Sequence, residues 1–498
     1  MLCLGLDSGT TTCKGLVLEA DSGKVLAQAS AAHSFIDGLP RGHIEQDPQT
    51  WCDAAERVIQ SCLEKIGERR NEVVAFGVAS QQHGLVTLDD RNQPVRPAKL
   101  WCDTSTATEA EKLNRAFGNV DELIRRTGNA MVPGYTAPKI LWLKENEPKN
   151  FTHTRTILLP HDFLNFWLTG ERQMEYGDAS GTGLLDVQSR AWCEALVEFI
   201  DKNLLAKFPP LRSSTRPAGL LRSTLREKFQ LGDVLVSAGG GDNMLGAIGT
   251  GNIVTGRLSI SLGTSGTLYA FAETPIIDLK GEVSAFCDST DHWLLLACTM
   301  NVASAVDRVR DLFRWEMNAV EKNVARSQAG ANGLTFLPFF DGERLPNLPN
   351  GCGVIHGLNS NNTNRHDIAR ALIEGIVVGL AQGMKRLVDL GIHADELRII
   401  GGGAKSATMR QIVSDIFEMP VMGVKIAEGA ALGAAIQAAW TYGQTKGDPL
   451  PLEKIVKSAV KADRKTRAEP RKENETPYAE LRGRHADLTR KLASSGYL

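Results

Sequence analysis

The sequence lacks the cysteine spacings that indicate disulfide bonds or a zinc site. It has 498 residues and nine cysteines, an odd number, and no two of them form a C-x-x-C pair. Disulfide frameworks and structural zinc sites normally show paired spacings of that kind. Reduced thiols are therefore expected, and they are typical of a cytoplasmic protein.

The chain also has little net charge and no long apolar run. Its 56 lysines and arginines oppose 58 aspartates and glutamates, so neither nucleic acid nor an anionic membrane is expected as a partner. No uncharged apolar run reaches the roughly 18 residues that a membrane-spanning helix needs. The first apolar run contains Asp7 and follows no basic segment, so we expect no signal peptide.

The composition is otherwise that of a globular protein, with 42% hydrophobic and 23% charged residues. The length exceeds that of one ordinary core and predicts about two to four domains. Glycine is abundant, and its 48 residues gather in short clusters instead of regular repeats. Such clusters favour ligand-binding loops over low-complexity sequence.

A glycine-rich stretch near the middle of the chain, Ser237–Asn243, follows a short apolar strand at 234–236. Its three glycines free the backbone of side chains, and Asp242 stands at their end. One interpretation is that Asp242 caps a helix over 243–249, because aspartate is a favoured N-cap residue. The other is that its carboxylate projects toward a bound ligand.

The N-terminus predicts a β-hairpin whose loop is rich in hydroxyl groups. Strands are expected at 2–6 and 14–19, with Gly9, Thr10 and Thr11 in the turn between them. Successive backbone N–H groups in such turns form concave sites for anions. The loop therefore predicts either a phosphate site or an ordinary polar hairpin.

Polar residues also follow an apolar strand at 73–78, which ends in Gln82 and His83. Ligands of α/β folds bind at the carboxyl ends of strands, so this pair is a candidate for ligand contact. A single histidine is more often a structural hydrogen-bonding group, which is the alternative for His83. Asp103 lies in a loop a little further along the chain.

The second half of the chain begins with the same pattern as the first. A strand at 257–261 leads into Gly263, Thr264 and Ser265, and another strand follows at 268–271. When the two halves are aligned at an offset of 254 residues, Gly9-Thr10 of the first loop matches Gly263-Thr264 of the second. Two similar hairpins, each opening one half of the chain, predict two related halves with a cleft between them.

A further glycine cluster follows a buried strand at 397–400. Gly401, Gly402, Gly403 and Ala404 come just before a helix at 408–417, an arrangement suited to binding a nucleotide. The Gly-x4-Gly-Lys-Ser/Thr spacing of a P-loop is absent, so that fold is disfavoured.

These motifs, in this order, resemble the FGGY family of carbohydrate kinases over about residues 2–440. The motifs are Gly5-Leu-Asp7-Ser-Gly-Thr-Thr11, Glu45-Gln-Asp-Pro48, Gln82-His83-Gly84, Gly134-Tyr-Thr-Ala-Pro-Lys-Ile-Leu-Trp142, Asp178-Ala-Ser-Gly-Thr182, Gly239-Gly-Gly-Asp-Asn243, Leu262-Gly-Thr-Ser-Gly266, Gly342-Glu-Arg344, Gly401-Gly-Gly-Ala-Lys-Ser406 and Glu428-Gly-Ala-Ala-Leu-Gly433.

The resemblance implies an actin-like, ribonuclease H-like α/β fold that is duplicated into two ATPase domains, with the active site in the cleft between them. The expected divisions are an N-terminal domain at 1–245, a C-terminal domain at 246–445 and a charged connector with a final helix at 446–498. We expect an exposed connector at 446–475 and a helix from about 477 to 492. The family includes monomers and homodimers, so either state is compatible with the sequence.

The resemblance also implies roles for individual residues. Asp242 would be the catalytic base, and Asp7 resembles the carboxylate that the family associates with Mg²⁺. The sugar would contact Gln82, His83, Asp103, Asp242 and Asn243. The ATP phosphates would bind Gly9, Thr10, Thr11, Gly263, Thr264 and Ser265, and the adenosine would lie against Gly401, Gly402, Gly403 and Ala404.

The implied reaction is ATP-dependent phosphorylation of the terminal hydroxyl of a ketopentose, D-xylulose before other acceptors. The alternatives within the family are kinases of ribulose, gluconate, glycerol or a heptulose. Two departures bear on the sugar, because bacterial members acting on D-xylulose usually carry Met-His at Gln82-His83 and Asn-Asp-Gly-Arg at 102–105. An actin-like ATPase switch without sugar chemistry and a two-carboxylate glycosidase are the alternatives from other classes.

Overall fold

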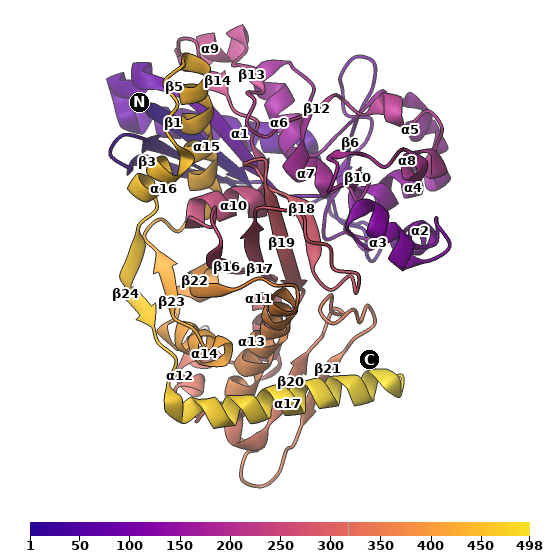
Figure 1. Cartoon of the computed structure of the whole chain (residues 1–498), viewed down its shortest axis with the longest axis vertical. Coiled ribbons are helices and arrows are strands. Elements are labelled where there is room, and N and C mark those ends of the chain that lie inside the picture. The colour runs from indigo at the N-terminus through magenta and orange to yellow at the C-terminus, as the bar shows by residue number, and fades with distance from the viewer. Residues whose placement is uncertain (317) are drawn as a thin grey trace. The chain divides into compact units, whose positions relative to one another are not determined.

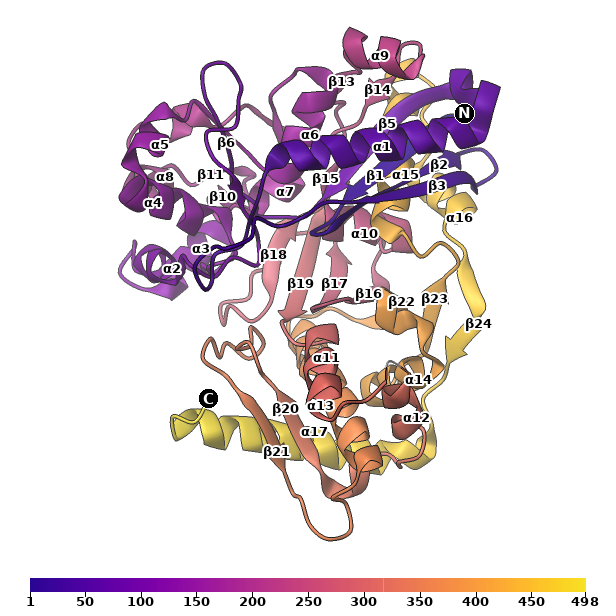
Figure 2. The same ribbon diagram turned by 180° about the vertical axis from the view of Figure 1, so that it is seen from behind.

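The computed structural model describes residues 1–316 and 318–498, which form two compact units (Figure 1, Figure 2). Unit 1 comprises Met1–Ile253, Phe271–Leu294 and Glu428–Lys461, and unit 2 comprises Val254–Ala270, Leu295–Ala427 and Ala462–Leu498. Each unit is thus built from three segments of the chain. None of the described helices is long and apolar enough to cross a membrane.

Unit 1 is organised around a mixed sheet with the strand order β13-β14-β5-β1-β2-β3, and β15 also pairs with β5. Strand β1 is antiparallel to β2 and parallel to β5, and both β14 and β15 run parallel to β5. Central strands of this kind are buried on both faces, which explains the continuous apolar run at the start of β1. The strands are β1 (Leu2–Ser8), β2 (Thr12–Glu19), β3 (Lys24–Ala32), β5 (Val73–Ser80), β13 (Gly219–Leu220), β14 (Leu235–Val236) and β15 (Gly240–Gly241).

Helices cover both faces of this sheet. Helix α1 (Pro48–Ile66) begins after Asp47, whose side chain accepts a hydrogen bond from the Gln49 N–H, and it packs Trp51 and Val58 into the core. Helix α15 (Gly429–Lys446) covers the opposite face, as the two views in Figures 1 and 2 show.

Helix α15 packs backbone against backbone through glycines. A Cβ atom on Gly5 of β1 would lie 2.0 Å from the Ala431 carbonyl oxygen, and one on Gly77 of β5 would lie 2.1 Å from the Ala434 carbonyl oxygen. A Cβ atom added to Gly433 would likewise lie 1.8 Å from the Leu245 carbonyl oxygen of helix α10 (Asp242–Thr250). These contacts explain why a helix late in the chain belongs to unit 1.

The other elements of unit 1 are shorter. Its remaining helices are α2 (Ala107–Asn114), α3 (Val120–Thr127), α4 (Thr136–Asn146), α5 (Pro148–His153), α6 (Pro160–Thr169), α7 (Tyr176–Ser180), α8 (Glu194–Ile200), α9 (Ser223–Phe229) and α16 (Leu452–Ala459), with 3-10 turns at Gly67–Glu72 and Leu205–Lys207. Its remaining strands are β4 (Glu45–Gln46), β6 (Val86–Leu88), β7 (Ala98–Lys99), β8 (Thr156–Leu158), β9 (Met174–Glu175), β10 (Leu185–Asp186), β11 (Ala191–Trp192), β12 (Leu211–Arg212) and β18 (Ser284–Cys287).

Unit 2 has its own mixed sheet, in which the strands run in the order β19-β17-β16-β22-β23-β24. These strands are β16 (Gly256–Leu262), β17 (Gly266–Ala272), β19 (Trp293–Thr299), β22 (Ala394–Ile400), β23 (Val421–Val424) and β24 (Ala462–Ala468). The other elements are α11 (Ala303–Leu312), α12 (Ala319–Val324), α13 (Arg365–Asp389), α14 (Ala407–Phe417), α17 (Lys472–Ser494), the hairpin β20 (Thr335–Pro338) and β21 (Gly353–His356), and 3-10 turns at Ala331–Gly333 and Gly402–Lys405.

The two sheets repeat one topology. In unit 1 the β1–β2 hairpin is antiparallel and β5 and β14 lie parallel to β1, and in unit 2 the β16–β17 hairpin, β22 and β23 are arranged alike. The edge strands β13 and β24 are each antiparallel to their neighbours. The prediction of a duplicated α/β fold is therefore confirmed.

The C-terminal segment differs from the exposed connector expected at 446–475, and that prediction is wrong. Leu452, Ile455, Val456 and Ala459 lie on one buried face of α16, and β24 pairs with β23 at the edge of the unit 2 sheet. The charged side chains of β24 mostly face solvent, so its composition hid the strand. Helix α17 begins at Lys472, earlier than expected. The contiguous divisions at 246 and 446 differ from the compact units, because α15 and α16 pack in unit 1.

The glycine contacts of α15 lead to a stability prediction. Replacing Gly433 with alanine forces the helices apart, and overpacking of this kind costs about 1–3 kcal/mol. We expect Gly433→Ala to lower the melting temperature in a thermal unfolding scan. Gly483→Ala is the control, because Gly483 is an exposed residue of α17 with open space around its Cβ position. That change should be neutral or stabilising, and equal melting temperatures for both variants would contradict the packing argument.

Candidate active site

Three strands of unit 1 end side by side and bring the sequence-predicted residues to one edge of the sheet. Asp7 of β1 is in register with Ala79 of β5, and Ala79 is in register with Gly240 of β15. Neighbouring strands lie about 4.8 Å apart, so Asp7 and the residues that follow β15 are separated by roughly 10 Å. The polar residues after β5 lie between them.

The triple glycine does not form the simple strand-to-helix turn that the sequence suggested. Val236 pairs with Phe76, and Gly240 pairs with Ala79. The chain advances four residues from β14 to β15 while β5 advances three, so a bulge with one extra residue separates β14 from β15. Gly239 lies in that bulge with φ of 72°, a conformation that favours glycine. Gly241 lies under the Gln82 side chain, whose Cγ would be 2.6 Å from an added Cβ.

Asp242 is the first residue of helix α10, and Gly241 occupies the N-cap position. The alternative in which Asp242 caps a helix that starts at Asn243 is therefore wrong. The Asp242 Oδ1 atom accepts hydrogen bonds from the Asn243 N–H at 2.8 Å and the Asn243 Nδ2 at 2.9 Å. Across residues 1–316 and 318–498 the hydrogen bonds to this carboxylate both end on Oδ1, which leaves Oδ2 for a ligand.

The environment of Asp242 disfavours its charged form. Burial, together with the negative charges of Asp7 and Asp178, raises the pKa of Asp242 to about 8 against the lowering effect of the Asn243 N–H. A base with a pKa near the working pH is well matched to proton transfer.

A short chain of hydrogen bonds connects this carboxylate to the end of β5. Asn243 Nδ2 donates both to Asp242 and to Gln82 Oε1, at 3.0 Å. The Gln82 Nε2 atom is buried and has no protein partner among the described residues. Gln82 therefore orients Asn243 through its oxygen and retains an unused donor close to Asp242.

His83 is held in an uncommon backbone conformation, with φ of 65°. Its carbonyl accepts hydrogen bonds from Thr136 Oγ1 and Lys139 Nζ, both at 3.1 Å, and its Nδ1 lies 2.7 Å from the Gly181 carbonyl oxygen. Because a carbonyl can only accept, Nδ1 carries a proton. Tyr135 packs beside the ring, with centroids 4.8 Å apart, so the imidazole is fixed on both sides.

A buried charged network close to Asp242 was missed as a unit by sequence reasoning, although Asp178 stood in one of its motifs. His161 Nδ1 lies 2.6 Å from Asp178 Oδ2, and His161 Nε2 lies 3.2 Å from Asp162 Oδ1. Burial opposes the charged imidazole, but these two carboxylates outweigh it and raise the pKa of His161 to about 10. The imidazolium thus balances negative charge close to Asp242. No spacing rule links His161 with Asp178, so only the fold could reveal the pair.

Hydrogen bonds from the rest of unit 1 hold the first hydroxyl-rich loop, Gly9 to Thr11. Gly9 N–H donates to the Thr12 carbonyl at 3.1 Å, Gln46 Nε2 donates to the Thr10 carbonyl at 2.6 Å, and Trp101 Nε1 donates to Thr10 Oγ1 at 3.0 Å. With its oxygen accepting from the indole, the Thr10 hydroxyl keeps its own hydrogen to donate. Thr11 is exposed.

Asp7 carries an unsatisfied oxygen at the end of β1. Its Oδ1 atom is buried and has no hydrogen-bond partner within the described residues. Burial raises the pKa of Asp7 to about 6; Lys14, which is paired with Glu428 at 2.8 Å, acts in the lowering direction. A buried carboxylate oxygen without a donor suits a cation ligand.

The two predicted loops of unit 2 lie next to each other. Strands β16 and β22 are parallel, with Ser261 in register with Ile400, so both loops begin at one edge of the sheet. Gly401 has φ of 88°, and an added Cβ would lie 2.5 Å from the Leu262 oxygen. The carbonyls of Gly263 and Thr264 accept hydrogen bonds from the first N–H groups of the α11 region. Thr264, Gly401 and Gly402 are exposed.

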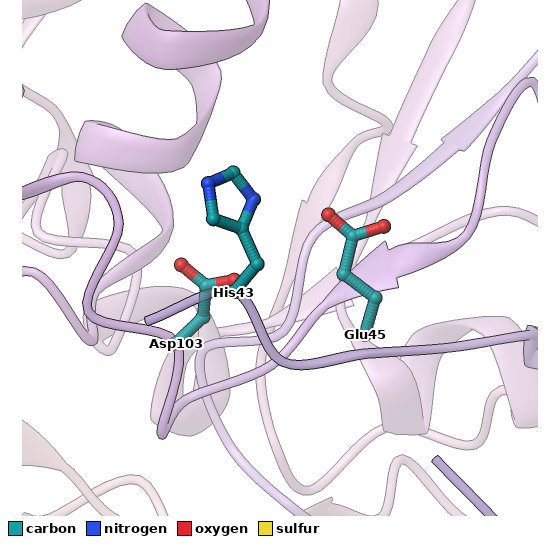
Figure 3. A group of neighbouring side chains, drawn as sticks. All are labelled: His43, Glu45 and Asp103. Carbon is teal, nitrogen blue, oxygen red and sulfur yellow. The ribbon is translucent and has the colours of Figure 1, made fainter. Parts of the chain in front are cut away.

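Asp103 lies in a buried cluster with His43 and Glu45, where one ligand atom from each residue falls within 4.8 Å of the others (Figure 3). The spacing suits a metal ion, but the Lys99 ammonium already lies among them. Lys99 Nζ is 3.1 Å from Asp103, 3.2 Å from Glu45 and 3.2 Å from His43 Nδ1, and its side chain is fully buried. The ammonium group of Lys99 therefore occupies the position that a metal ion would need.

Both oxygens of Asp103 are used inside unit 1. Oδ1 accepts from the Ser105 N–H and hydroxyl, and Oδ2 accepts from the Ile44 N–H and Lys99. Burial raises the pKa of Asp103, but these bonds and the Lys99 charge outweigh it, so the pKa lies below its usual value. Asp103 is thus a fixed, ionised group in this arrangement, unlike Asp242.

Comparisons with known proteins identify the family. The model of the FGGY family of carbohydrate kinases, N-terminal domain, matches residues 2–249, and that of its C-terminal domain matches residues 258–442. The xylulose kinase of Haemophilus influenzae is 38% identical over 474 residues, which are 94% of this chain and 95% of that protein.

Solved structures agree with this result. The xylulose kinase of Bifidobacterium adolescentis is 31% identical with a TM-score of 0.80, and the match covers 97% of this chain and 99% of that one. The gluconate kinase of Lactobacillus acidophilus has a TM-score of 0.91 at 24% identity, over 99% and 98% of the two chains, which shows a common fold.

Two duplicated α/β units with paired glycine–hydroxyl loops, together with these matches, define an enzyme that transfers a phosphoryl group to a carbohydrate hydroxyl. The chain belongs to the FGGY family of carbohydrate kinases. Kinases of this family use ATP as the phosphoryl donor and, like kinases generally, need a divalent cation.

The raised pKa of Asp242 predicts a pH-dependent gain in stability for Asp242→Asn. An aspartate in the unfolded chain ionises near about pH 4, whereas Asp242 in the folded protein has a pKa of about 8. The wild type therefore loses stability as pH rises through this window, because the folded state resists ionisation. The variant should melt at a higher temperature than wild type at about pH 9, with a smaller gain at about pH 5.

The exposed Asp90 supplies the control, since Asp90→Asn should give the same melting temperature as wild type at both pH values. A gain for Asp242→Asn that does not change with pH would contradict the role of burial.

Proposed function

We propose that the protein transfers the γ-phosphoryl group of ATP to the terminal hydroxyl of D-xylulose, forming D-xylulose 5-phosphate and ADP. The observation that carries the reaction chemistry is Asp242, a carboxylate with one oxygen unused by the protein and a pKa of about 8. The choice of sugar is supported by 38% identity to a xylulose kinase over nearly the whole of both chains.

In this proposal the carboxylate of Asp242 accepts the proton of the sugar hydroxyl. The hydroxyl oxygen then forms its bond to the γ-phosphorus, and the bond between that phosphorus and the β,γ-bridging oxygen of ATP breaks. A sugar hydroxyl has a pKa far above 7, so a base within about 3 Å of it is needed. Phosphoryl transfer otherwise depends on positioning and on charge neutralisation.

Asn243 and Gln82 orient the base and, with His83, supply polar groups to the sugar. The single hydrogen-bond chain from Gln82 to Asp242 fixes Oδ1 and leaves Oδ2 for the hydroxyl. The fixed imidazole of His83 lies at the end of the same strand. Both oxygens of Asp103 accept hydrogen bonds from the protein, so this residue supports its own loop. It would contact the sugar only if a sugar hydroxyl donated to an oxygen that already accepts a bond.

The phosphate donors would be the two glycine–hydroxyl loops, Gly9 to Thr11 and Gly263 to Ser265, through backbone N–H and hydroxyl groups. Gly401 to Ala404 would contact the adenosine, because its glycines leave an exposed, side-chain-free surface. Asp7 would hold Mg²⁺ through its unpartnered oxygen, and the ion when bound neutralises phosphate charge.

A panel of acceptors tests the proposed function. Release of ADP from MgATP is followed with D-xylulose, ribulose, gluconate, glycerol and a heptulose, and we expect the highest kcat/KM with D-xylulose. A higher value with another acceptor would overturn the substrate. Equal ATP consumption with and without any acceptor would instead favour a switch ATPase.

Replacement of the base tests the mechanism. Asp242→Ala should lower kcat by about 10²–10⁴-fold, the range expected for a general base, while ATP still binds in a calorimetric titration. Asp90→Ala is the matched control for removing an aspartate, and its kcat should equal that of wild type. Near-normal turnover in Asp242→Ala would show that another group takes the proton.

A further inference from the structure

Gln437 of helix α15 contacts the chain that leads to Asp242, although the two regions lie about 200 residues apart in sequence. Its side chain is fully buried and makes five hydrogen bonds. Oε1 accepts from the Gly239 N–H at 2.8 Å and from the Ser237 hydroxyl at 2.9 Å. Nε2 lies within hydrogen-bond distance of the carbonyls of Gly239 at 3.1 Å, Ser289 at 3.1 Å and Ser214 at 3.3 Å, so its two hydrogens are shared among three acceptors.

These partners fix the orientation of the amide without ambiguity. The Gly239 N–H can only donate, so it faces the oxygen of the amide, and the three carbonyls can only accept, so they face its nitrogen. A flipped amide would leave at least four buried groups unpaired. The amide of Gln437 is therefore held in a single orientation.

The contact falls at the bulge that separates β14 from β15. Strand β5 pairs with Val236 before the bulge and with Gly240 after it, and it provides no partner for Gly239 between them. Gln437 supplies both missing bonds of that residue, one to its N–H and one to its carbonyl. A buried peptide group without such a partner costs about 1–3 kcal/mol, so the amide is what makes a bulge tolerable here.

The bulge in turn decides where Asp242 lies. It adds one residue between the two stretches that pair with β5, and this extra residue sets the register of Gly240 and Gly241 with Ala79 and Ser80. Helix α10 and its first residue follow directly. If the bulge relaxed by one residue, Gly240 and Gly241 would lose their register with Ala79 and Ser80, and the start of helix α10 would shift with them.

We infer that Gln437 is a positioning residue of the phosphoryl transfer, because its amide replaces strand β5 as the partner of the Gly239 peptide and so holds Asp242 in place. The inference rests on the proposed function in assuming that Asp242 is the base. Gln437 is fully buried and all its amide partners are groups of the protein, so it acts through Gly239.

The test compares Gln437→Met with Gln444→Met. Methionine keeps the length of glutamine but removes all five hydrogen bonds, whereas Gln444 is an exposed residue of the same helix. We expect Gln437→Met to lower kcat per folded enzyme by about 10- to 100-fold, the cost of a base displaced by about 1 Å. KM for ATP should stay at the wild-type value. Gln444→Met should match wild type in both constants.

The pH profile separates positioning from a purely structural effect. In a loosened loop water reaches Asp242, and the rising limb of kcat/KM should move to lower pH than in wild type. Loss of folded protein alone would reduce the yield of active enzyme without moving this limb. An unchanged kcat per folded enzyme, or a lowered kcat with an unmoved limb, would overturn the inference.

A second variant covers the case in which Gln437→Met does not fold. Gln437→Asn keeps the amide but shortens its reach by one methylene group, and it should show the same kcat-specific loss at smaller size. Wild-type kcat and pH profile in Gln437→Asn would contradict the inference. Asp242→Ala tests the base separately: if it is inactive while both Gln437 variants match wild type, the inference alone fails, whereas an active Asp242→Ala contradicts the proposed base.

Discussion

The site in unit 1 depends on one constraint, which is that the ionisable carboxylate of Asp242 is held half-buried near two other carboxylates. Asp242 begins a helix, where the dipole and free N–H groups favour a negative charge, yet burial and two nearby carboxylates favour its protonated form. The opposing effects bring its pKa near neutrality. A base in that range can take a proton and later release it, which a fully solvated aspartate does poorly. The imidazolium of His161 limits the repulsion by offsetting the charge of Asp178 close to Asp242.

Close backbone packing makes this environment reproducible. Helix α15 lies directly on β1, β5 and α10 because glycines remove the side chains that would hold them apart. The three elements that carry Asp7, Gln82 and Asp242 are therefore fixed against one common support. If side chains filled a wider gap, the relative positions of these three elements would depend on side-chain rotamers. Direct contact between peptide groups removes that dependence. Rigid support of this kind is what a proton transfer over about 3 Å requires.

The sequence predicted the parts of the site that depend on local pattern. Both hairpins, the strands that precede Gln82, Asp242 and Gly401, and the duplicated order of elements follow from apolar periodicity and turn residues. It did not predict the bulge at Gly239, because register is set by pairing with β5 and leaves no mark in the sequence of β14. It also missed the bond partners of Asp103 and Asp178, since spacing does not reveal which charged groups are buried together. Helix α16 was overlooked because charged neighbours concealed its apolar face.

The place of α15 in the chain has a consequence for biosynthesis. All strands of the unit 1 sheet that contact this helix are complete before residue 250, but the helix itself ends at Lys446. The strands of this sheet are therefore synthesised before the helix that covers one of its apolar faces. Residues 254–427 are synthesised between them. Nascent chains in that condition are prone to aggregation and are typical clients of chaperones. In this protein unit 1 therefore lacks its covering helix until residues 295–427 of unit 2 have been synthesised.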